Sequence, residues 1–441
     1  MATIGLSMIV KNGGDDLRHC LKSVRSLVDQ IVIADTGSTD NTRDTAAEFG
    51  ATVVPFPWKD HYAEARNAAL EPLTTDWVLV LDPDEELTPE AASAIPELLD
   101  RNTGVGGYQL VIRNYTRERF TCIAGSLSRP NHDNVARAKD APCYVEHRLC
   151  RLFRRHPAIF FSGRVHEQVE PQISSSGLRL CGSDLRILHF GQLADASYFG
   201  KKQEYYRKVL RTALEESPNM QHLWIQLGIV EREGLRNSAA ALECFENAVR
   251  LNPGDADAWA MIGTIQREKQ RFEEAVQAFQ KIPDHGDMAV IRAWSLADIF
   301  HDTGRLEEAR AMYLRARKLT QKDGDSLGTE FRSALESKLG YTEVRLGFHK
   351  SGFRRLRRAI KLTPKMLECH DRLVKACVLV QDDNDAADAA EAILQHFASE
   401  KIFLRAAALR LRIQQRERAC RLLEAAVRLF PESDSLRKLQ S

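Results

Sequence analysis

Residues 76–86 read DWVLVLDPDEE, a run of five apolar residues that passes directly into a loop of acids. A run this apolar predicts a β-strand that is buried on both faces. Along an extended chain, alternate side chains point to the same side. Asp82 and Asp84 are one residue apart, so they are expected to project to one place just beyond the strand.

The neighbouring segments repeat this order of strand, polar loop and helix. Apolar strands are predicted at Ile4–Val10 and Gln30–Ala34, and they end in KNGG (11–14) and DTGS (35–38). Helices are predicted after these strands, at 17–27 and 39–49. A short strand at 52–55 is followed by a third helix at 62–70. This alternation predicts a Rossmann-like, mostly parallel α/β sheet, which we assign to residues 1–195. Ligands of such sheets bind beyond the carboxyl ends of the strands, where these polar loops meet.

From about residue 200 the apolar pattern becomes purely helical and repetitive. Small residues recur where two helices would touch, with large apolar residues between them, as in Gly228, Phe245, Gly263, Phe279, Gly340 and Gly352. This spacing resembles the tetratricopeptide repeat, in which each helix pair needs neighbours to bury its core. We therefore predict an all-α tetratricopeptide-repeat superhelix with a concave face at residues 196–441.

Charge and cysteine content narrow the classes of function. The chain has 62 Lys and Arg against 61 Asp and Glu, so its net charge of +1 calls for no nucleic acid as a partner. Its nine cysteines form no Cys-x-x-Cys pair, which is typical of a reducing compartment. No apolar run has the length of a signal peptide or a transmembrane helix. We expect a cytoplasmic protein, and peripheral attachment to the inner face of the membrane stays open.

The acidic loop is a candidate metal site. Asp82 and Asp84 offer two hard oxygen ligands, which suit Mg²⁺ or Mn²⁺ held together with a diphosphate. A cation there would neutralise charge on a departing nucleotide. The alternative is an ordinary acidic turn, because acids are common in turns.

Further segments resemble family-2 glycosyltransferases with the GT-A fold. They read LSMIVKN (6–12), IVIADTGSTDNT (31–42) and ARNA (65–68), and with the acidic stretch the resemblance covers about residues 3–190. It implies that Lys11 and Asn12 line the nucleotide pocket and that Asp35 contacts the uracil or ribose. It also implies that Arg66 reaches the diphosphate or base as a bidentate donor, while Asp82 contacts both the nucleotide-sugar and the metal.

A second cluster reads RLCRLFRR (148–155), FSGRVHEQ (161–168) and LHFG (188–191). It resembles bacterial family-2 enzymes with a tetratricopeptide array behind the catalytic domain, among them peptide and protein glycosyltransferases of the sublancin S-glycosyltransferase type. An inverting transfer needs a base for the acceptor proton, and the candidate is Glu167. His166 is assigned to catalysis beside it, and His189 to the metal with Asp82 and Asp84. Arg151 and Arg154 are assigned to the nucleotide-sugar.

Each assignment in the second cluster has a structural alternative. Either histidine is also explained as a satisfied structural residue, and the arginines as solvated side chains. Glu167 is also explained by a salt bridge with Arg164 or Arg151. Residues 113–145 are polar and poor in pattern, so we predict a long irregular loop that contacts the acceptor.

The leading functional hypothesis is an inverting glycosyltransferase that uses a UDP-hexose or UDP-N-acetylhexosamine donor and Mn²⁺ or Mg²⁺. Because concave helical arrays hold extended peptides, a peptide or protein side chain is the favoured acceptor. An alternative sends the sugar to a surface glycan or a lipid-linked saccharide, and the repeats then serve docking or formation of a homodimer. A third hypothesis is a repeat scaffold with an inactive catalytic domain, which the complete set of acids and Arg66 argues against.

Overall fold

The computed structural model describes residues 2–100, 104–118, 121–123, 125–193, 199–322, 327–433 and Leu436. The chain forms two compact units, Met1–Ile265 and Gln266–Ser441. The first unit contains an α/β domain and the first helices of the repeat region, and the division falls inside helix α9 (Ala256–Glu268). The boundary predicted between residues 195 and 196 lies outside the described residues and stays a prediction.

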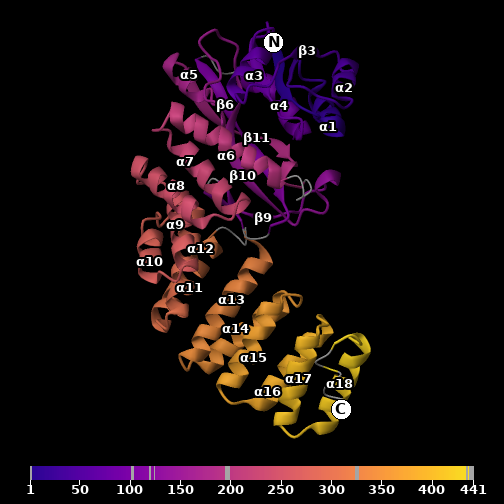
Figure 1. Ribbon diagram of the computed structural model, residues 1–441, viewed down its shortest axis with the longest axis vertical. Coiled ribbons are helices and arrows are strands. Elements are labelled where there is room, and N and C mark those ends of the chain that lie inside the picture. The colour runs from indigo at the N-terminus through magenta and orange to yellow at the C-terminus, as the bar shows by residue number, and fades with distance from the viewer. Residues whose placement is uncertain are drawn as a thin grey trace. The chain divides into compact units, whose positions relative to one another are not determined.

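Nine strands form the sheet in the described part of the first unit, in the order β3-β2-β1-β4-β10-β6-β11-β5, with β9 beside β10 (Figure 1). Their bounds are β1 Ile4–Val10, β2 Gln30–Asp35, β3 Thr52–Pro55, β4 Trp77–Val80, β5 Glu85–Leu87, β6 Val105–Thr116, β9 Arg129–Pro130, β10 Cys143–Arg154 and β11 Arg179–His189. A separate hairpin pairs β7 (Cys122–Ile123) with β8 (Ser126–Leu127).

The first four strands in space, β3, β2, β1 and β4, are all parallel, which confirms the predicted α/β class. The helices of this domain are α1 Gly14–Val24, α2 Thr42–Glu48, α3 Tyr62–Leu70, α4 Pro89–Asp100 and α5 Glu170–Ser175. The sheet carries an apolar core on each face, because alternate residues of one strand enter different cores. Leu79 belongs to the core with α1 and α4, whereas Val78 and Val80 belong to the core with α3. Burial on both faces explains the continuous apolar run at β4.

The second half of the sheet is mixed, and part of it corrects the loop predicted at residues 113–145. Strand β10 runs antiparallel to both β4 and β6, and Cys143–Phe153 pairs with Gly107–Thr116. The predicted loop therefore begins and ends inside two long strands. Polar residues interrupt the apolar pattern of these strands, and in the folded chain they have hydrogen-bond partners. Arg113 donates to Asp133 and Glu146, and Asn114 donates to the Val145 carbonyl. Paired polar side chains are tolerated in a buried strand, but their partners cannot be read from local sequence.

The repeat region is helical throughout its described residues, as predicted. In the first unit it comprises α6 Phe199–Glu216, α7 Gln221–Ile229, α8 Ser238–Leu251 and most of α9, with a π-helical turn at Val230–Gly234. The second unit continues with α10 Phe272–Gln280, α11 Gly286–Asp302, α12 Leu306–Lys322, α13 Gly328–Arg345, α14 His349–Leu362, α15 Leu367–Leu379, α16 Asp383–Ala392, α17 Glu400–Arg412 and α18 Arg416–Leu429. None of the described helices combines the length and apolar character needed to cross a bilayer.

Small residues lie at the helix crossings where the repeat pattern places them. A Cβ added to Gly340 in α13 would lie 2.8 Å from the carbonyl oxygen of Gly352 in α14, and one added to Gly352 would lie 2.6 Å from the Gly340 oxygen. A Cβ on Gly228 would lie 2.7 Å from the ring of Phe245. The helices of a repeat therefore approach as closely as glycine allows.

Helix α6 is anchored to the α/β domain within the first unit. The Trp58 indole N–H donates to the Tyr205 hydroxyl at 2.6 Å, and that hydroxyl donates to Asp60 at 2.7 Å. The hydroxyl of Tyr62, at the start of α3, lies 3.2 Å from that of Tyr206. These contacts join the first helices of the repeat region to the α/β domain within the first unit.

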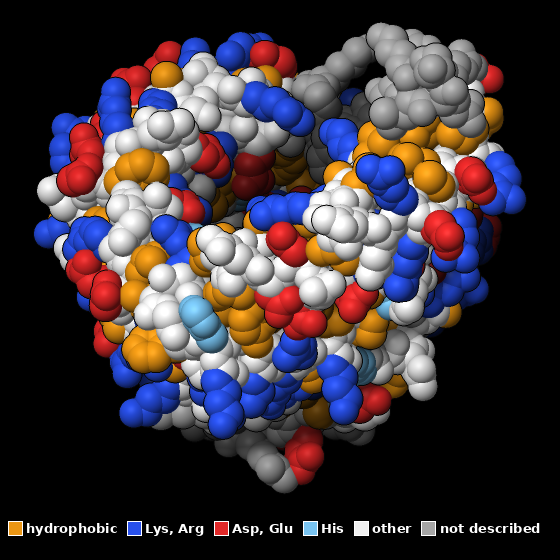
Figure 2. Space-filling model, turned by 90° about the horizontal axis from the view of Figure 1, so that it is seen from below, with side chains coloured by type: hydrophobic (Ala, Val, Ile, Leu, Met, Phe, Trp, Pro, Cys, Tyr) orange, Lys and Arg blue, Asp and Glu red, His pale blue; other side chains and the backbone are white. Residues whose placement is uncertain are grey.

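The molecular surface mixes charges of both signs. On the face shown in Figure 2, basic and acidic side chains alternate with apolar ones instead of gathering in one patch. Interspersed charges give a weak long-range field and favour solubility.

Candidate functional site

The acidic loop after β4 is tightly closed on itself. The Glu85 N–H donates to the Asp82 carbonyl at 3.0 Å, and the Asp82 N–H donates to the Glu85 carboxylate at 2.9 Å. Strand β4 lies beside β1, and a Cβ added to Gly13 would lie 3.5 Å from Pro83. The loop therefore sits at the carboxyl edge of the parallel strands, as the sequence predicts.

Two buried arginines hold the carboxylate of Asp82. Arg66 Nη2 donates to Asp82 Oδ1 at 2.6 Å, and Arg151 Nη2 donates to Asp82 Oδ2 at 3.1 Å. The two arginines are only 5% and 9% exposed. Burial alone would raise the pKa of Asp82, but the two guanidiniums outweigh that effect and lower it. Asp82 is therefore ionised, with both of its oxygens engaged.

A β-bulge directs Arg151 toward the acids. In the pairing of β10 with β6, Cys150 lies opposite Gln109 and Leu152 opposite Tyr108, so Arg151 is an extra residue in its strand. A bulge of this kind turns a side chain out of the regular alternation. The sequence singles out Arg151 as one of several arginines, and the bulge is what selects it.

Each buried guanidinium keeps one unused donor. Arg66 Nη1 and Arg151 Nε are buried and have no hydrogen-bond partner. A buried N–H without a partner costs free energy, so an unpaired donor calls for an explanation such as a ligand. Guanidinium donors prefer phosphate or carboxylate oxygens. The two side chains therefore keep hydrogen-bonding capacity beside Asp82 that the described chain does not use.

Glu85 is a functional candidate without a predicted role. It is 1% exposed and accepts a hydrogen bond of 2.7 Å from Arg151 Nη2. Its burial raises its pKa despite the opposing charge of Arg151. Glu85 fixes the guanidinium that in turn holds Asp82. The sequence feature that could have identified Glu85 is its position in the acidic stretch, directly after Asp84.

Arg66 also holds the candidate base. Its Nε donates to Glu167 Oε1 at 2.8 Å, so one guanidinium joins Asp82 to Glu167. The sequence leaves a salt bridge to Arg164 or Arg151 open, but the observed partner is Arg66, and Arg164 instead pairs with Glu216. Glu167 is thus brought to the cluster by Arg66.

His166 lies next to Glu167 in a different environment. It is exposed, and its φ of 52° lies in the left-handed region that a side chain of this size rarely adopts. The segment is closed by a bridge between Ser162 and Gln168. The partners of Asp82 and Asp84 are Arg66, Arg151 and His189, so His166 is not brought to these acids.

Asp84 faces His189 rather than the arginines. Asp84 Oδ2 and His189 Nε2 are 3.4 Å apart, and a Cβ added to Gly191 would lie 2.5 Å from the former and 2.7 Å from the latter. Burial lowers the pKa of His189, but the hydrogen bond to Asp84 and the charges of Glu85, Asp84 and Asp82 together raise it. Asp84 Oδ2 and His189 Nε2, two atoms able to bind a cation, thus face each other beside Gly191, which has no side chain to fill the position between them.

Asp84 and His189 offer two of the several ligands that a divalent cation requires. Among the described residues, no group of three or more His, Cys, Asp or Glu side chains is arranged to hold a metal ion. The pair of Asp84 and His189 fits a Mg²⁺ or Mn²⁺ that takes its other ligands from a diphosphate and water. Asp82, the third predicted ligand, has both oxygens on arginines.

On the nucleotide side, the predicted residues organise the loops at the carboxyl edge. Asp35 accepts hydrogen bonds from the Ser38 N–H at 2.9 Å and from the Arg43 guanidinium. Burial opposes ionisation of Asp35, but these bonds outweigh it and lower its pKa. Asn12 accepts from the Thr39 N–H at 2.8 Å, and Lys11 beside it is exposed.

Arg154 is not brought to the cluster. It lies opposite Trp77 at the beginning of β4, and its guanidinium stacks 4.6 Å from the Trp77 ring. Its Nε donates to the Val105 carbonyl at 2.7 Å. The five residues from Trp77 to Asp82 separate it from the acids by roughly 16 Å along the strand. Arg151 and Arg154 belong to one strand, but only Arg151 reaches the acids.

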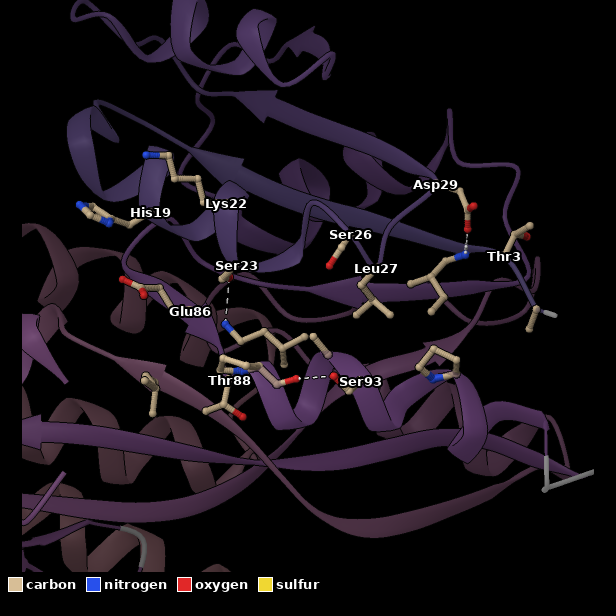
Figure 3. Close-up of a pocket in the computed structure, with 17 residues that line it drawn as sticks. Thr3, His19, Lys22, Ser23, Ser26, Leu27, Asp29, Glu86, Thr88 and Ser93 are labelled. Atoms are coloured by element: carbon tan, nitrogen blue, oxygen red, sulfur yellow. Dashed lines mark hydrogen bonds between the residues drawn. The ribbon is translucent and has the colours of Figure 1, made fainter. Parts of the chain in front are cut away.

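A cavity of about 820 Å³ lies elsewhere, between α1 and α4. Figure 3 shows Ser23, Thr88 and Ser93 beside it, with Glu86 at one end and Thr3 and Asp29 at the other. Thr3 and Asp29 precede β1 and β2, so this end of the cavity is at the amino ends of those strands. None of the predicted site residues lines it.

The fold and the cluster define the class of protein first. A parallel α/β sheet with acids and buried arginines at its carboxyl edge is a nucleotide-binding architecture. Residues 6–160 match the family described as glycosyl transferase family 2, and residues 230–289, 293–323 and 402–433 match tetratricopeptide repeat families. The chain therefore contains a family-2 glycosyltransferase domain followed by tetratricopeptide repeats, and it is a glycosyltransferase.

Similar proteins come from bacteria and a phage. A TPR repeat-containing protein of Synechococcus elongatus is 28% identical over 334 residues, which are 69% of this chain and 73% of that protein. An uncharacterized glycosyltransferase of Rickettsia felis is 34% identical over 161 residues, 32% of this chain and 56% of that protein. Glycosyltransferase SunS of Bacillus phage SPbeta is 27% identical over 168 residues, 38% of this chain and 34% of that protein. The chain thus spans about half of the Rickettsia protein and a third of SunS.

Proposed function

We propose that this protein is an inverting glycosyltransferase that moves a hexose or N-acetylhexosamine from a UDP-sugar to a side chain of a peptide or protein. The observation that carries the proposal is the pair of buried guanidiniums on Asp82, each with one unpaired N–H. Such donors match the diphosphate of a nucleotide-sugar in charge and geometry.

The donor side follows from the cluster. When the bond between the anomeric carbon and the diphosphate oxygen breaks, its electron pair and negative charge pass to the departing UDP. Arg66 and Arg151 are fixed in advance by Asp82, Glu85 and Glu167, so they offer positive charge at little cost of reorganisation. Lys11, Asn12 and Asp35, at the same edge, would contact the nucleotide.

A divalent cation, Mn²⁺ or Mg²⁺, completes the proposed donor site and would supply Lewis-acid neutralisation of the diphosphate. Asp84 and His189 are the residues that would hold it, since their facing atoms are 3.4 Å apart. Asp82 would contribute indirectly, because it orients both arginines.

On the acceptor side, Glu167 would take the proton of the attacking group as that group bonds to the anomeric carbon. The bond to Arg66 uses Glu167 Oε1 and holds the carboxylate near the donor. His166 is exposed next to it and would contact the incoming acceptor. Attack on the face opposite the departing diphosphate inverts the anomeric configuration.

The proposed acceptor class and cellular location are supported by the repeat helices and by the cysteines. Tetratricopeptide helices α6–α9 are built into the same compact unit as the catalytic residues, which favours a peptide or protein acceptor guided by repeats. The eight cysteines whose side chains are described form no disulfide, which supports a cytoplasmic location.

The test is release of UDP from UDP-hexoses and UDP-N-acetylhexosamines by the full-length protein with Mn²⁺. We expect one donor to be consumed, and Asp84→Ala to abolish its consumption. Asp184→Ala is the control, because Asp184 is 92% exposed and pairs with Arg148 at the surface. No turnover or binding of any sugar nucleotide would sink the proposal.

A second experiment separates acceptors. Radiolabelled donor is incubated with fractionated bacterial lysate, and the label is followed into protein, lipid and polysaccharide. Label that is removed by protease supports a peptide or protein acceptor. Label in lipid or polysaccharide alone contradicts it and favours a surface glycan or a lipid-linked saccharide.

A further inference from the structure

Asn114 links the candidate metal pair to the interior of the sheet. It lies in β6, in register with His189 of β11 on one side and Val145 of β10 on the other. Its side chain is buried, with 4% exposure. The amide oxygen Oδ1 lies 2.7 Å from His189 Nδ1.

The partners of Asn114 determine which way its amide points. Its Nδ2 lies 3.2 Å from the Val145 carbonyl and 3.4 Å from the Ile112 carbonyl, and carbonyls only accept hydrogen bonds. The NH₂ group must therefore face these two oxygens. The carbonyl oxygen of Asn114 is left to face His189, and it too can only accept.

His147 supports the same orientation from the neighbouring strand. Its Nδ1 lies 3.0 Å from Asn114 Nδ2. Burial and the charge of Arg151 lower the pKa of His147 to about 4, so its ring is neutral and Nδ1 can accept. Three acceptors thus surround the amide nitrogen of Asn114, and none is left for a reversed amide.

We propose that Asn114 is a positioning residue that keeps the proton of neutral His189 on Nδ1, so that the lone pair of Nε2 points at Asp84. This inference rests on the proposed function, because it gives that lone pair its use as a metal ligand. In a neutral imidazole one nitrogen donates and the other accepts. Because Asn114 Oδ1 takes the donor, Nε2 becomes the acceptor.

The contact at Nε2 belongs to the protonated ring. Asp84 Oδ2 lies 3.4 Å from Nε2, so the imidazolium donates to this carboxylate, and the neutral ring, with its remaining proton on Nδ1, presents the Nε2 lone pair on the same side. Metal-binding histidines usually donate their other ring N–H to an oxygen, which fixes the tautomer and the ring orientation. Asn114 occupies that place here, and Gly191 leaves room in front of Nε2.

The tautomer is measurable in the metal-free, full-length protein by long-range ¹H–¹⁵N NMR of ¹⁵N-histidine. The chain has 13 histidines, so His189 is assigned by the signal that is lost in His189→Gln. Above the pKa of His189 we expect Nδ1 to be protonated and Nε2 to be unprotonated. A proton on Nε2 instead would overturn the inference without any bearing on sugar transfer.

Variants test whether Asn114 sets this state. Asn114→Leu should shift the proton toward Nε2. Asn131→Leu is the matched control, because Asn131 Nδ2 also donates to two backbone carbonyls, at 2.9 Å each, away from His189. An unchanged tautomer in Asn114→Leu would overturn the role of Asn114. If Asn114→Leu does not fold, the wild-type spectrum still decides the tautomer.

The affinity for Mn²⁺ in the presence of UDP gives an independent measurement. Loss of a partner of this kind weakens metal binding by about 10- to 100-fold, which we expect for Asn114→Leu and not for Asn131→Leu. Equal Mn²⁺ affinity in wild type and Asn114→Leu would contradict the inference. Absence of Mn²⁺ binding to the wild type would contradict the proposed metal, while the NMR result would still decide the tautomer.

Discussion

Two regions of this protein bury arginines against carboxylates, one at the sheet edge and one in the repeats. In the repeats, Arg355 donates to Glu336 at 2.8 Å and to Glu343 at 3.0 Å, and both acids are nearly inaccessible. None of these three side chains has a buried polar atom without a partner. At the sheet edge, Arg66 and Arg151 each retain one.

The difference separates a structural ion-pair cluster from a site prepared for a ligand. Arg355 Nε and Nη1 are both engaged by acids of its own chain, and its cluster has no buried donor without a partner. Arg66 and Arg151 are held rigidly by acids while part of their hydrogen-bonding capacity is unused. Buried charge by itself therefore does not identify a functional site, and at the sheet edge the distinguishing feature is that two arginines with an unpartnered nitrogen hold the same carboxylate.

Arg66→Met is the most direct test of this difference, because it removes a guanidinium that has a nitrogen without a hydrogen-bond partner. Loss of one preorganised donor to developing charge costs about 10²- to 10³-fold in rate, and we expect kcat/KM to fall by that factor. The measurement is steady-state UDP release. Arg155→Met is the control, because Arg155 donates to the Leu73 carbonyl, away from the acids. Equal activity in Arg66→Met and wild type would contradict the assigned role.

Arg355→Met makes the matching change in the saturated cluster. It leaves Glu336 and Glu343 buried with fewer partners, and breaking a buried pair costs about 3–5 kcal/mol. We expect about 3 kcal/mol of unfolding free energy, the low end of that range, because Arg317 and Arg310 still reach the two acids. Denaturant unfolding measures this loss, and donor affinity of the folded protein should stay unchanged. A weaker donor affinity would mean that this cluster also serves the site.

Gly340→Ala tests close packing in the repeats without touching a charge. The added methyl group would lie 2.8 Å from the backbone oxygen of Gly352, which cannot rotate away. Overpacking of this kind costs about 1–3 kcal/mol, measured by thermal or denaturant unfolding. Gly254→Ala is the matched control, since its methyl group meets only Asn252 Oδ1 at 3.5 Å. A loss of stability as large in the control would refute the packing explanation.

Gly191→Ala is the smallest change at the sheet edge. Its methyl group would press on Asp84 Oδ2 and His189 Nε2, which are ends of side chains that can move apart. We expect about tenfold weaker Mn²⁺ binding, or about 1.4 kcal/mol, with little change in thermal stability. Gly182→Ala in β11 is the control, because the nearest neighbour of its methyl group would be Arg148 Nη1 at 3.9 Å. Isothermal titration with Mn²⁺ and UDP that shows equal affinities would remove these two residues from the metal site.

Several site residues were predictable because their signal is local. Asp82 and Asp84 follow a buried strand, and the carboxyl ends of parallel strands meet at one edge whatever the details of packing. Asp35 and Asn12 are at that edge for the same reason. Arg66 was predicted from the resemblance of its segment to family-2 glycosyltransferases, and the structure brings it to Asp82.

Other residues were not predictable because their positions depend on pairing between distant strands. Arg151 and Arg154 are three residues apart and look equivalent in sequence, but a bulge turns one toward the acids while the other stacks on Trp77. Asn114 lies in a segment that reads as a loop, and only its register with β10 and β11 gives it partners.

The sequence by itself determined the two kinds of architecture, because the spacing of apolar residues differs between strands and helices. It also determined that acids gather where the parallel strands end. Only the tertiary structure decided how those acids are used. Asp82 is bound by two arginines from α3 and β10, whereas Asp84 faces a histidine from β11. These contacts span 16, 69 and 105 residues of chain, and their geometry is set by strand register, a bulge and burial, which no local pattern of residues encodes.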